Sequence, residues 1–437
     1  MARKKTRGVE PNSDELKPWP EKVMGRKYVR MLSSYARQLR DEDTAESHGN
    51  RELYLNDVFI VFLISFFTPS IRSLRTIEDF SQTTQAQAHI SIRRICKSTL
   101  SDFNKLADPK RLEPILHVLR HEVEKRQNKS GNVSNDELPA ELLEHLVAVD
   151  GTFVPAVSEV TWAIKNCNNH GEQRRRARLD AHVNVGSFVP EAIVVPEPGE
   201  SEADSAISAI SDGRIYLYDR GYMSFALLRA HYEETGDELT ERAQFVSRFK
   251  PECSNSPKLC CVEERLLTKQ DIAAGVISDR IGHFTSDNAK SAGVSSIRFR
   301  EVIVIFEQDG ETKTLRLITN LLDVSATTIA VLYRQRWQVE LFFRWLKSYA
   351  NFSHLICHGR EGVQFHLYVA IIGIMLMYLH TGYRPSKYTL VMLELVATGG
   401  ATIEEILPIL RERERQNDLA KKSAKARAEK KKQEQGK

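Results

Sequence analysis

Two short apolar runs, each ending in an aspartate, constrain the fold of this chain more than any other feature. They are residues 146–151, LVAVDG, and residues 215–221, IYLYDRG. Apolar runs of this length, bounded by turn residues, are typical of strands buried on both faces of a sheet. We therefore expect two central strands, with Asp150 and Asp219 at their carboxyl ends.

The segments around these runs predict an α/β core. Further strands are expected at residues 181–186, 192–195 and 244–249, and helices at residues 201–210 and 225–232. This order of elements is typical of a sheet with helices packed on it.

The region that follows this core differs in composition. Residues 251–319 are richer in β-branched and turn residues, and Asp309-Gly310 predicts a hairpin between strands at 296–306 and 312–318. The pattern then becomes helical, and we expect one long helix over residues 325–349 with Ser325 or Thr327 as its N-cap.

The two ends of the chain are less informative. Residues 58–123 have a helical pattern, and the segment 411–437 carries eleven Lys or Arg against five acids, which predicts a solvated helix or a disordered tail. The whole chain has 62 basic and 58 acidic residues, so net charge indicates little. The apolar runs at 58–67 and 367–379 are shorter than the roughly 20 residues of a membrane span, so we expect core helices and no membrane.

The two strand-terminal aspartates suggest a metal site. Carboxylates at the carboxyl ends of central strands lie in the crevice where such sheets bind ligands. Mg²⁺ prefers oxygen ligands, and a pair of such ions can activate the attacking oxygen and stabilise the leaving oxygen of a phosphodiester. For Asp150 or Asp219 alone a plain turn cap is also open, since Asp-Gly is a common turn pair.

A third acid lies on the expected long helix. Tyr333, Arg336, Glu340 and Lys347 are offset by 0, 3, 7 and 14 residues, which places them within a sector of roughly 60° on a helix. One interpretation is a salt-bridge ladder. The other is a metal ligand bracketed by cations that bind phosphate, because Arg grips phosphate with two hydrogen bonds and Lys acts as a point charge.

Taken together, these residues resemble a known family. The spacing Tyr-x2-Arg-x3-Glu-x6-Lys matches the Y-R-E-K signature of the insertion-sequence-4 family of bacterial DDE transposases. The family's first acid follows a short strand, as Asp150 does, and its second lies in an Asp-Arg-Gly-Tyr turn, as at residues 219–222. The basic strand at residues 245–250 is also family-like, and the resemblance covers roughly residues 146–350.

The resemblance implies a fold class and a division of the chain. The fold is an α/β ribonuclease-H-like catalytic core with a β-rich insertion, flanked by mainly helical N- and C-terminal regions. The expected parts are an N-terminal helical DNA-binding region, the first part of the core, the insertion, the closing helix of the core, and a C-terminal helical region with a basic tail. Their expected bounds are 1–140, 141–250, 251–319, 320–350 and 351–437.

The resemblance also implies a chemistry. Asp150, Asp219 and Glu340 would be the catalytic and metal-binding residues, with Mg²⁺ or Mn²⁺, two ions in all. The protein would cut DNA at the terminal inverted repeats of an insertion sequence and join the 3′-OH ends to target DNA. The residues expected to contact DNA are Tyr333, Arg336, Lys347, Arg248, Lys250 and Arg220.

The remaining expectations concern partners and alternatives. A homodimer on DNA is expected, in the bacterial cytoplasm and associated with the nucleoid. Relatives that form DNA hairpins place a Trp in the insertion, but this chain has none between residues 163 and 336, so Phe284, Phe299 or Phe306 would have to stack on a base. A domesticated DNA-binding protein and a nuclease without strand transfer remain alternatives.

Overall fold

The computed structural model describes the chain in segments. These are residues 32, 34–40, 53–67, 71, 73–87, 90, 92–106, 108–130, 138–155, 164–167, 173–197, 199–236, 238–251, 256–308, 311–349, 360–381, 388–389, 391–392, 395 and 400–435. They fold into two compact units. One comprises the described residues of Met1–Arg126 and Ser348–Lys437, and the other those of Gln127–Lys347.

The first unit is helical. Its described elements are α2 (Leu55–Phe67), α3 (Leu74–Ser81), α4 (Thr84–Gln87), α5 (Lys97–Leu106), the 3₁₀ turn η1 (Pro109–Leu112), most of α6 (Glu113–Ser130), α14 (Arg360–Thr381) and α16 (Ile403–Gln435). Helices α2 and α14 pack together through Phe62 and Phe365, whose rings meet edge to face with centroids 5.4 Å apart. Gly373 allows the close approach, because a Cβ there would clash with the Phe66 ring.

Helix α14 contains a stretch that is long and apolar enough to cross a membrane, Arg360–Leu379. In the structure 89% of its apolar window is buried inside the protein. That is the environment of a core helix, as the sequence predicted for residues 367–379.

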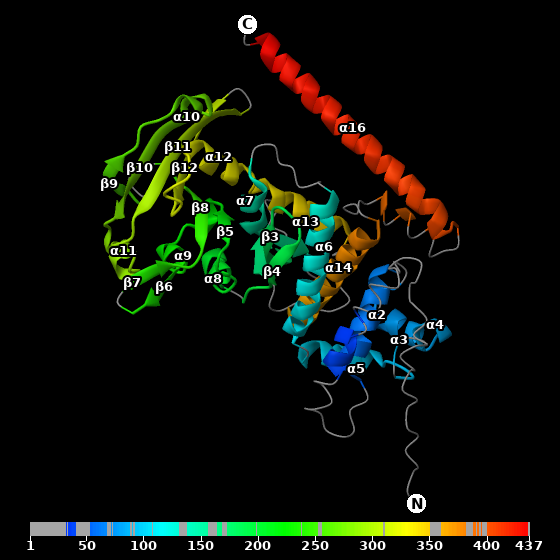
Figure 1. Cartoon of the computed structure of the whole chain (residues 1–437). Helices are drawn as coiled ribbons and strands as arrows, with labels where there is room; N and C mark the ends of the chain where they lie inside the picture. The colour runs from blue at the N-terminus through cyan, green and yellow to red at the C-terminus, as the bar shows by residue number, and fades with distance from the viewer. Residues whose placement is uncertain are drawn as a thin grey trace, which may run out of the picture. The chain divides into compact units, whose positions relative to one another are not determined.

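The second unit is built on one large mixed sheet (Figure 1). Its strands are β1 (Leu146–Pro155), β2 (Ile164–Cys167), β3 (Gln173–Asn184), β4 (Pro190–Val194), β5 (Ile215–Tyr218), β8 (Gln244–Phe249), β9 (Leu259–Glu264), β10 (Val276–Phe284), β11 (Phe299–Gln308) and β12 (Glu311–Thr319). They lie in the order β2-β3-β1-β5-β8-β12-β11-β10-β9, with β4 beside β3. A separate two-stranded sheet joins β6 (Tyr232–Thr235) to β7 (Glu238–Glu241).

Helices and turns connect these strands. They are α7 (Ala140–His145), α8 (Glu202–Ile207), the 3₁₀ turn η2 (Arg220–Tyr222), α9 (Phe225–Arg229), α10 (Lys269–Ala273), α11 (Asp287–Ser291), α12 (Ala326–Arg334) and α13 (Trp337–Tyr349). The N-terminus of α12 is capped as expected, because the Ser325 side chain accepts a hydrogen bond from the Thr328 amide.

The centre of the sheet explains the apolar runs of the sequence. β5 pairs in parallel with β1 on one side and with β8 on the other, and all four of its residues are buried. The apolar core there gathers residues of β1, β5, β8, α8 and α9, among them Val149, Tyr216 and Phe245. A strand between two neighbours and beneath helices has no solvent face, which is why its sequence does not alternate.

The predicted β-rich region continues this sheet. β12 pairs antiparallel with β8, and β11 and β10 follow on from it. β11 and β12 pair as Gln308 opposite Glu311, which confirms the predicted hairpin, although the two residues between them lie outside the described residues. The described part of residues 251–319 therefore extends the sheet that holds the two aspartates.

Candidate active site

Asp150 and Asp219 lie at the same level on neighbouring strands because of the parallel register between β1 and β5. The ladder ends with Ala148 opposite Leu217, positions that differ by 69 in sequence (217 − 148 = 69). The two aspartates differ by the same number (219 − 150 = 69). Each carboxylate thus stands two residues beyond the last paired position, and same-level residues of parallel strands share a face.

The predicted strand end at Asp150 is nevertheless wrong. β1 continues to Pro155, and Asp150 pairs with Ala181 of β3 inside an antiparallel ladder. The Asp150-Gly151 pair is therefore not a turn. The strand runs on because β3 offers it a second partner after β5 has ended, and the local sequence carries no sign of that partner.

The next strand adds a cation at the same level. β8 pairs with β5, with Tyr218 opposite Ser247, so Arg248 stands beside Asp219. Nη1 of Arg248 lies 3.7 Å from Oδ1 of Asp219. Three neighbouring strands therefore present two carboxylates and one guanidinium in a row.

Helices α12 and α13 bring the signature residues to this row. The Tyr333 hydroxyl donates a hydrogen bond of 3.2 Å to Oδ1 of Asp219. Gln335 and Arg336 form a turn between the helices, in which the Arg336 amide bonds to the Tyr333 carbonyl at 3.0 Å. The prediction of one helix over residues 325–349 is wrong at this point. The sequence has no helix breaker here, so the tighter turn could not be foreseen.

Arg336 joins two of the three acids. Its Nη2 lies 2.7 Å from Oε1 of Glu340, and its Nη1 lies 3.6 Å from Oδ2 of Asp150. Burial by itself would lower the pKa of the guanidinium, but Tyr333, Asp219 and the two bonded acids raise that pKa overall. The predicted residues Asp150, Asp219, Glu340, Tyr333 and Arg336 thus form one connected group.

This group carries more negative than positive charge near Asp150. Burial raises the pKa of Asp150 to about 6, and the neighbouring Glu340 and Asp219 raise it as well. Arg336 and the Gly151 amide act in the opposite direction without offsetting the burial. An added cation would stabilise the ionised form of a carboxylate in this environment and lower its pKa.

The donor set fits a divalent cation, although its present arrangement is not a metal cage. Among the residues that the structure describes, no three His, Cys, Asp or Glu side chains are placed so that they could hold a metal ion. Asp150 and Glu340 instead face the Arg336 guanidinium, which is the cation between them. Carboxylate oxygens are the ligands that Mg²⁺ and Mn²⁺ prefer, and the charges of Glu340 and Asp219 beside the buried Asp150 would favour the binding of such an ion.

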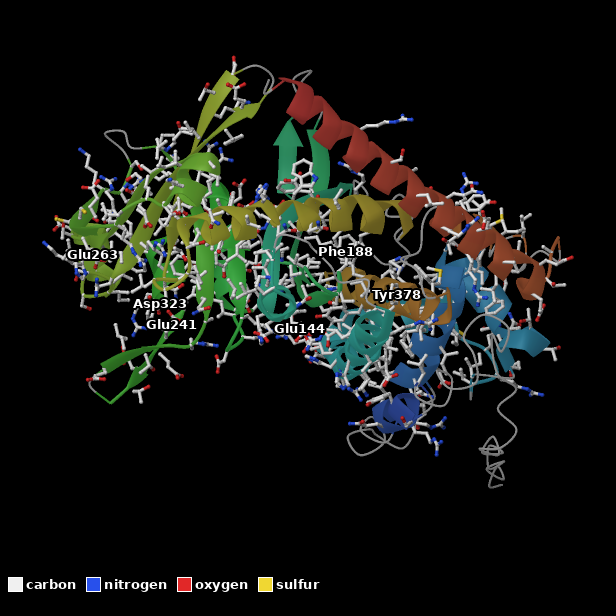
Figure 2. The ribbon with its side chains drawn as sticks, turned by 45° about the horizontal axis from the view of Figure 1, so that its top comes forward. Glu144, Phe188, Glu241, Glu263, Asp323 and Tyr378 are labelled. Atoms are coloured by element: carbon white, nitrogen blue, oxygen red, sulfur yellow. The ribbon has the colours of Figure 1, made fainter. Side chains whose placement is uncertain are left out.

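Packing against β4 and its preceding turn holds the helix of Glu340 in place. Phe188 packs against Phe342 of α13 with ring centroids 5.9 Å apart, and its position is marked in Figure 2. Phe188 has a φ of 60°, which costs a residue with a side chain about 1–2 kcal/mol. The buried aromatic contact offsets that strain and fixes the first turns of α13, where Glu340 lies.

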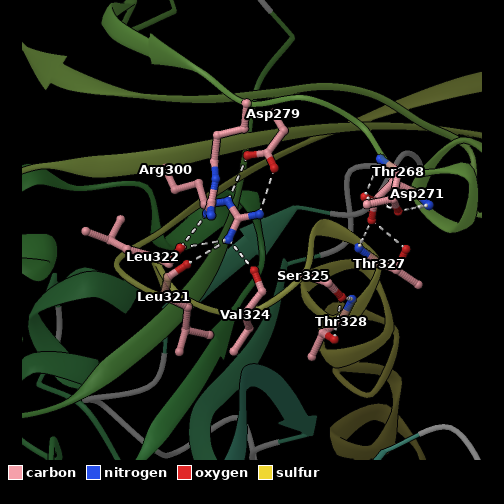
Figure 3. A network of polar contacts seen from close by, with 11 residues as sticks. Thr268, Asp271, Asp279, Arg300, Leu321, Leu322, Val324, Ser325, Thr327 and Thr328 are labelled. Atoms are coloured by element: carbon pink, nitrogen blue, oxygen red, sulfur yellow. Dashed lines mark hydrogen bonds and ion pairs between the residues drawn. The ribbon is translucent and has the colours of Figure 1, made fainter.

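A polar network holds the other helix. Arg300 of β11 donates to both oxygens of Asp279, and its Nη1 also donates to the carbonyls of residues 321, 322 and 324, which lead into α12 (Figure 3). Oδ1 of Asp271 accepts from the amide and the hydroxyl of Thr327 in the first turn of α12, at 2.9 and 2.8 Å. The outer strands thereby position the helix that carries Tyr333.

The remaining predicted contacts are less complete. Arg220 lies exposed in η2, directly after Asp219, and Lys250 lies exposed just after β8. Lys347 lies on α13, but its side chain falls outside the described residues. The DNA contacts of these three residues stay predictions.

Two of the three phenylalanines expected to stack on a base are buried. Phe284 and Phe299 are 1% and 0% exposed, so neither can present a ring face to a base. They lie in the core because β10 and β11 turn these positions towards α9 and β8, and only Phe306 is exposed. A cavity of about 770 Å³ does open beside the turn after Asp219, lined by α9, α11 and the end of β8.

Three polar residues lie around Gly151, on the face of β1 opposite to Asp150, and were not predicted as site residues: Asp180, Glu202 and Tyr222. A Cβ added to Gly151 would lie 2.8, 3.4 and 3.7 Å from their oxygens, respectively. Asp180 of β3 is 1% exposed and pairs with Arg178 at 3.1 Å, and burial raises its pKa to about 6. The available signal was the charged residue within the apolar strand 179–183, LDAHV.

Comparison with known proteins places the chain in a family. A family model described as the transposase DDE domain matches residues 141–376, which is 236 of the 437 residues (376 − 141 + 1 = 236). The chain belongs to this family. The matched segment contains all three acids and the whole Tyr333–Lys347 signature.

Curated relatives carry transposase names. A Sinorhizobium fredii protein so named is 25% identical over 230 residues, 52% of this chain and 59% of that protein. A Geobacillus stearothermophilus protein named for the insertion sequence element IS5377 is 42% identical over 78 residues, 18% of this chain and 20% of that protein. A Synechocystis protein named for the element IS4SA is 23% identical over 290 residues, 64% of this chain and 70% of that protein.

The family model confirms the predicted DDE transposase family, and one of these relatives is named for the element IS4SA. The chain spans about six tenths of the length of the first relative and one fifth of the second.

Proposed function

We propose that this chain is the transposase of a bacterial insertion sequence. It would bind the terminal inverted repeats of its element, hydrolyse a phosphodiester bond at each end, and join the freed 3′-OH to target DNA. The observation that carries the proposal is the convergence of Asp150, Asp219 and Glu340 around Arg336 within a chain of the DDE family.

The three acids would hold divalent metal ions, Mg²⁺ or Mn²⁺, with Asp150 shared between two ions. When bound, such ions lower the pKa of a water molecule and stabilise the charge on the leaving oxygen. Asp150 is the best placed of the three to be shared, because the charges of both Glu340 and Asp219 act on its carboxylate and raise its pKa. Water would then add to phosphorus and release a 3′-OH, and that hydroxyl would attack the target strand.

The cations around the acids would bind the phosphates on either side of the scissile bond. Arg336 would leave Glu340 and Asp150 for phosphate once metal ions neutralise these acids, because a guanidinium binds either oxyanion in the same way. Arg248, at the level of Asp219, is placed to do the same. The proposed DNA contacts are Tyr333, Arg336, Lys347, Arg248, Lys250 and Arg220.

The wider proposal concerns fold and partners. The parallel β1-β5-β8 centre, with an antiparallel β3 beside it, supports a ribonuclease-H-like core in which β9–β12 form the insertion. The partners would be end DNA and target DNA. Two ends must be cut together, so a homodimer on DNA is expected, acting in the bacterial cytoplasm at the nucleoid.

The test uses the three acids. Asp150→Asn, Asp219→Asn and Glu340→Gln should each abolish cleavage of DNA that carries the element ends, while DNA binding is retained. Glu238→Gln, an exposed acid on β7, is the matched control and should cleave normally. Cleavage should require Mg²⁺ or Mn²⁺ and stop in EDTA.

The outcomes separate three functions. Cleavage with joined products supports the transposase, and cleavage without joining would indicate a nuclease. Binding without cleavage by the wild-type protein would indicate a domesticated DNA-binding protein. Normal cleavage in any one of the three variants would remove that acid from the site.

A further inference from the structure

Helix α5 lies in the helical unit with one face buried and one face exposed. It packs against α3 and α14 of that unit. Leu100, in the first turn of α5, is 0% exposed, and apolar side chains of α3, of α4 and of the segment between α4 and α5 are buried as well. These are Ile77, Ala86, Ile90 and Ile95. Burial of one face fixes the place of the helix, so its other face is a defined surface.

Hydrogen bonds to α3 hold the start of α5. The Glu78 carboxylate of α3 accepts from Arg94 at 2.6 Å and from the backbone amide of Lys97, the first residue of α5. The Ser81 hydroxyl accepts from the Ile95 amide at 3.0 Å. The segment that leads into α5 is therefore tied to α3 by side chains. A surface that is ordered in advance loses little conformational entropy when it binds a partner.

The exposed face of α5 carries short polar side chains. Ser98 and Asp102 are exposed, and Ser101 is partly exposed. At 100° per residue these three positions fall within a sector of roughly 100° on the helix. A partner can approach this sector closely, because none of the three side chains is long.

The charge around the start of α5 fits a polyanion. Residues 92–101 include three cations, Arg93, Arg94 and Lys97, and no acid. Arg93 and Lys97 are exposed, and the Arg94 side chain is 56% exposed although it also pairs with Glu78. Cations of this kind bind the phosphates of DNA whatever the base sequence, and they fix the register of a protein on the duplex.

The polar side chains of the helix suit the edges of bases. An α-helix fits into the major groove of double-stranded DNA. Serine hydroxyls can bond to several bases there, and an aspartate accepts a hydrogen bond from the amino group of cytosine. One exposed side of α5 thus combines groups that read bases with neighbouring cations that bind phosphate.

We propose that α5 is the helix that recognises the ends of the element. It enters the major groove of double-stranded DNA, with Ser98, Ser101 and Asp102 towards the base edges and Arg93 and Lys97 on the phosphates. The inference rests on the proposed function, and it adds the surface that distinguishes end DNA from other DNA. This surface belongs to the helical unit, whereas the three acids lie in the other unit.

The test measures the preference for end DNA without cleavage. The probes are two fluorescent duplexes in EDTA, one copied from the inverted repeat that borders the reading frame and one with the same bases in scrambled order. The full-length wild type should prefer the first. Asp102→Asn and the double variant Ser98→Ala/Ser101→Ala should each lower that preference by roughly fivefold or more, the scale of a lost base contact.

The two kinds of contact predict different losses. Arg93→Ala should weaken binding to both duplexes alike. It should also make the slope of log affinity against log salt shallower by about 0.9, because one phosphate contact is lost. Asp102→Asn should instead abolish the penalty for changing one particular C·G pair of the end and leave the penalties at the other pairs unchanged.

A matched control and a folding check keep the result specific. Glu404→Gln changes an exposed acid on α16 of the same unit and should keep the wild-type preference. Thermal melting shows whether each variant is folded, and the serine double variant serves if Asp102→Asn is not. Wild-type preference in the folded α5 variants would overturn the proposal, and so would a wild type that binds both duplexes equally.

The proposed function fails in a different way. If the α5 variants lose the preference but the wild type never cleaves end DNA with Mg²⁺ or Mn²⁺, α5 reads the ends and the transposase proposal is wrong. If the ends are cut and joined while the α5 variants keep the preference, the transposase stands and α5 does not read its ends.

Discussion

The large sheet buries charge in two regions, and the regions balance it differently. In the outer strands each buried acid has guanidinium partners. Arg300 makes two hydrogen bonds to Asp279, of 2.8 and 2.7 Å, and Glu301 lies between Arg280 and Arg316. At the centre of the sheet, the three acids Asp150, Asp219 and Glu340 share two arginines, Arg336 and Arg248, and burial raises the pKa of Asp150 to about 6.

The difference separates structural from functional charge. A buried ion pair whose hydrogen bonds are complete holds its segments together, and removing one partner is costly. A group of acids with too few cations destabilises the fold unless something else binds there, and such perturbed groups are typical of functional sites. The outer network positions α12, and the central group is left to bind ligand.

The largest expected effect comes from breaking the outer network. Arg300→Met leaves Asp279 buried without its cation, so the free energy of unfolding should fall by about 3–5 kcal/mol. Denaturant unfolding measures it. Arg298→Met is the matched control, because Arg298 pairs with Glu263 in solvent at 2.9 Å, with side chains 50% and 49% exposed, and should cost less than about 1 kcal/mol. Equal losses of stability in the two variants would show that the buried Arg300–Asp279 pair is no more important to the fold than the exposed Arg298–Glu263 pair.

Replacing Asp150 should have the opposite effect and stabilise the folded protein. Because the pKa of Asp150 is about 6 in the folded protein and near 3.8 otherwise, the folded state holds its proton more tightly, and stability falls as pH rises between these values. Asp150→Asn removes that loss. Without metal, the free energy of unfolding of the variant relative to that of the wild type should rise by up to about 3 kcal/mol between pH 4 and pH 6. Above pH 6 the difference should stay constant. A difference that does not vary with pH would show that Asp150 titrates normally.

Arg336 tests whether a cation of the central group is held for phosphate. Arg336→Ala should weaken the complex with cleavage-site DNA by roughly tenfold to a hundredfold, the range for removing a hydrogen bond to a charged group. Arg336→Lys should restore only part of the DNA affinity, because lysine keeps the charge but lacks the planar, two-pronged guanidinium. If Arg336 is structural, thermal melting will instead show a large loss of stability while the folded fraction binds DNA normally.

The smallest effect is expected at the basic end of α16. Deleting residues 417–437 removes eight Lys or Arg and three acids. Non-specific DNA binding should weaken, and the slope of log affinity against log salt should become shallower, by about 0.9 for each phosphate that the tail no longer neutralises. Thermal stability should be unchanged. An unaltered slope would show that the tail does not bind phosphate.

Much of the site could be predicted from the sequence, and the exceptions have two causes. The central strands and the hairpin follow from local patterns, and the grouping of the three acids with Tyr333 and Arg336 follows from the resemblance to the transposase family. The course of β1 beyond Asp150, the break at Gln335 and the burial of Phe284 do not. The course of β1 and the burial of Phe284 depend on partners distant in sequence, β3 for the strand and Phe225 and Phe249 for the ring. The turn at Gln335 is made by local hydrogen bonds that helical periodicity does not distinguish from those of a continuous helix.

By itself the sequence determined the central strands through their apolar runs, and its resemblance to the transposase family named the residues that would come together. The structure supplied the register, because β1 and β5 pair in parallel at positions 69 apart, which is also the spacing of the two aspartates. Only the tertiary structure decided the charge around them. It assigned Arg336 to Asp150 and Glu340, placed Arg248 beside Asp219, and gave Asp180 its own arginine. The physical reason is that electrostatic balance depends on distance and burial, and neither is a property of local sequence.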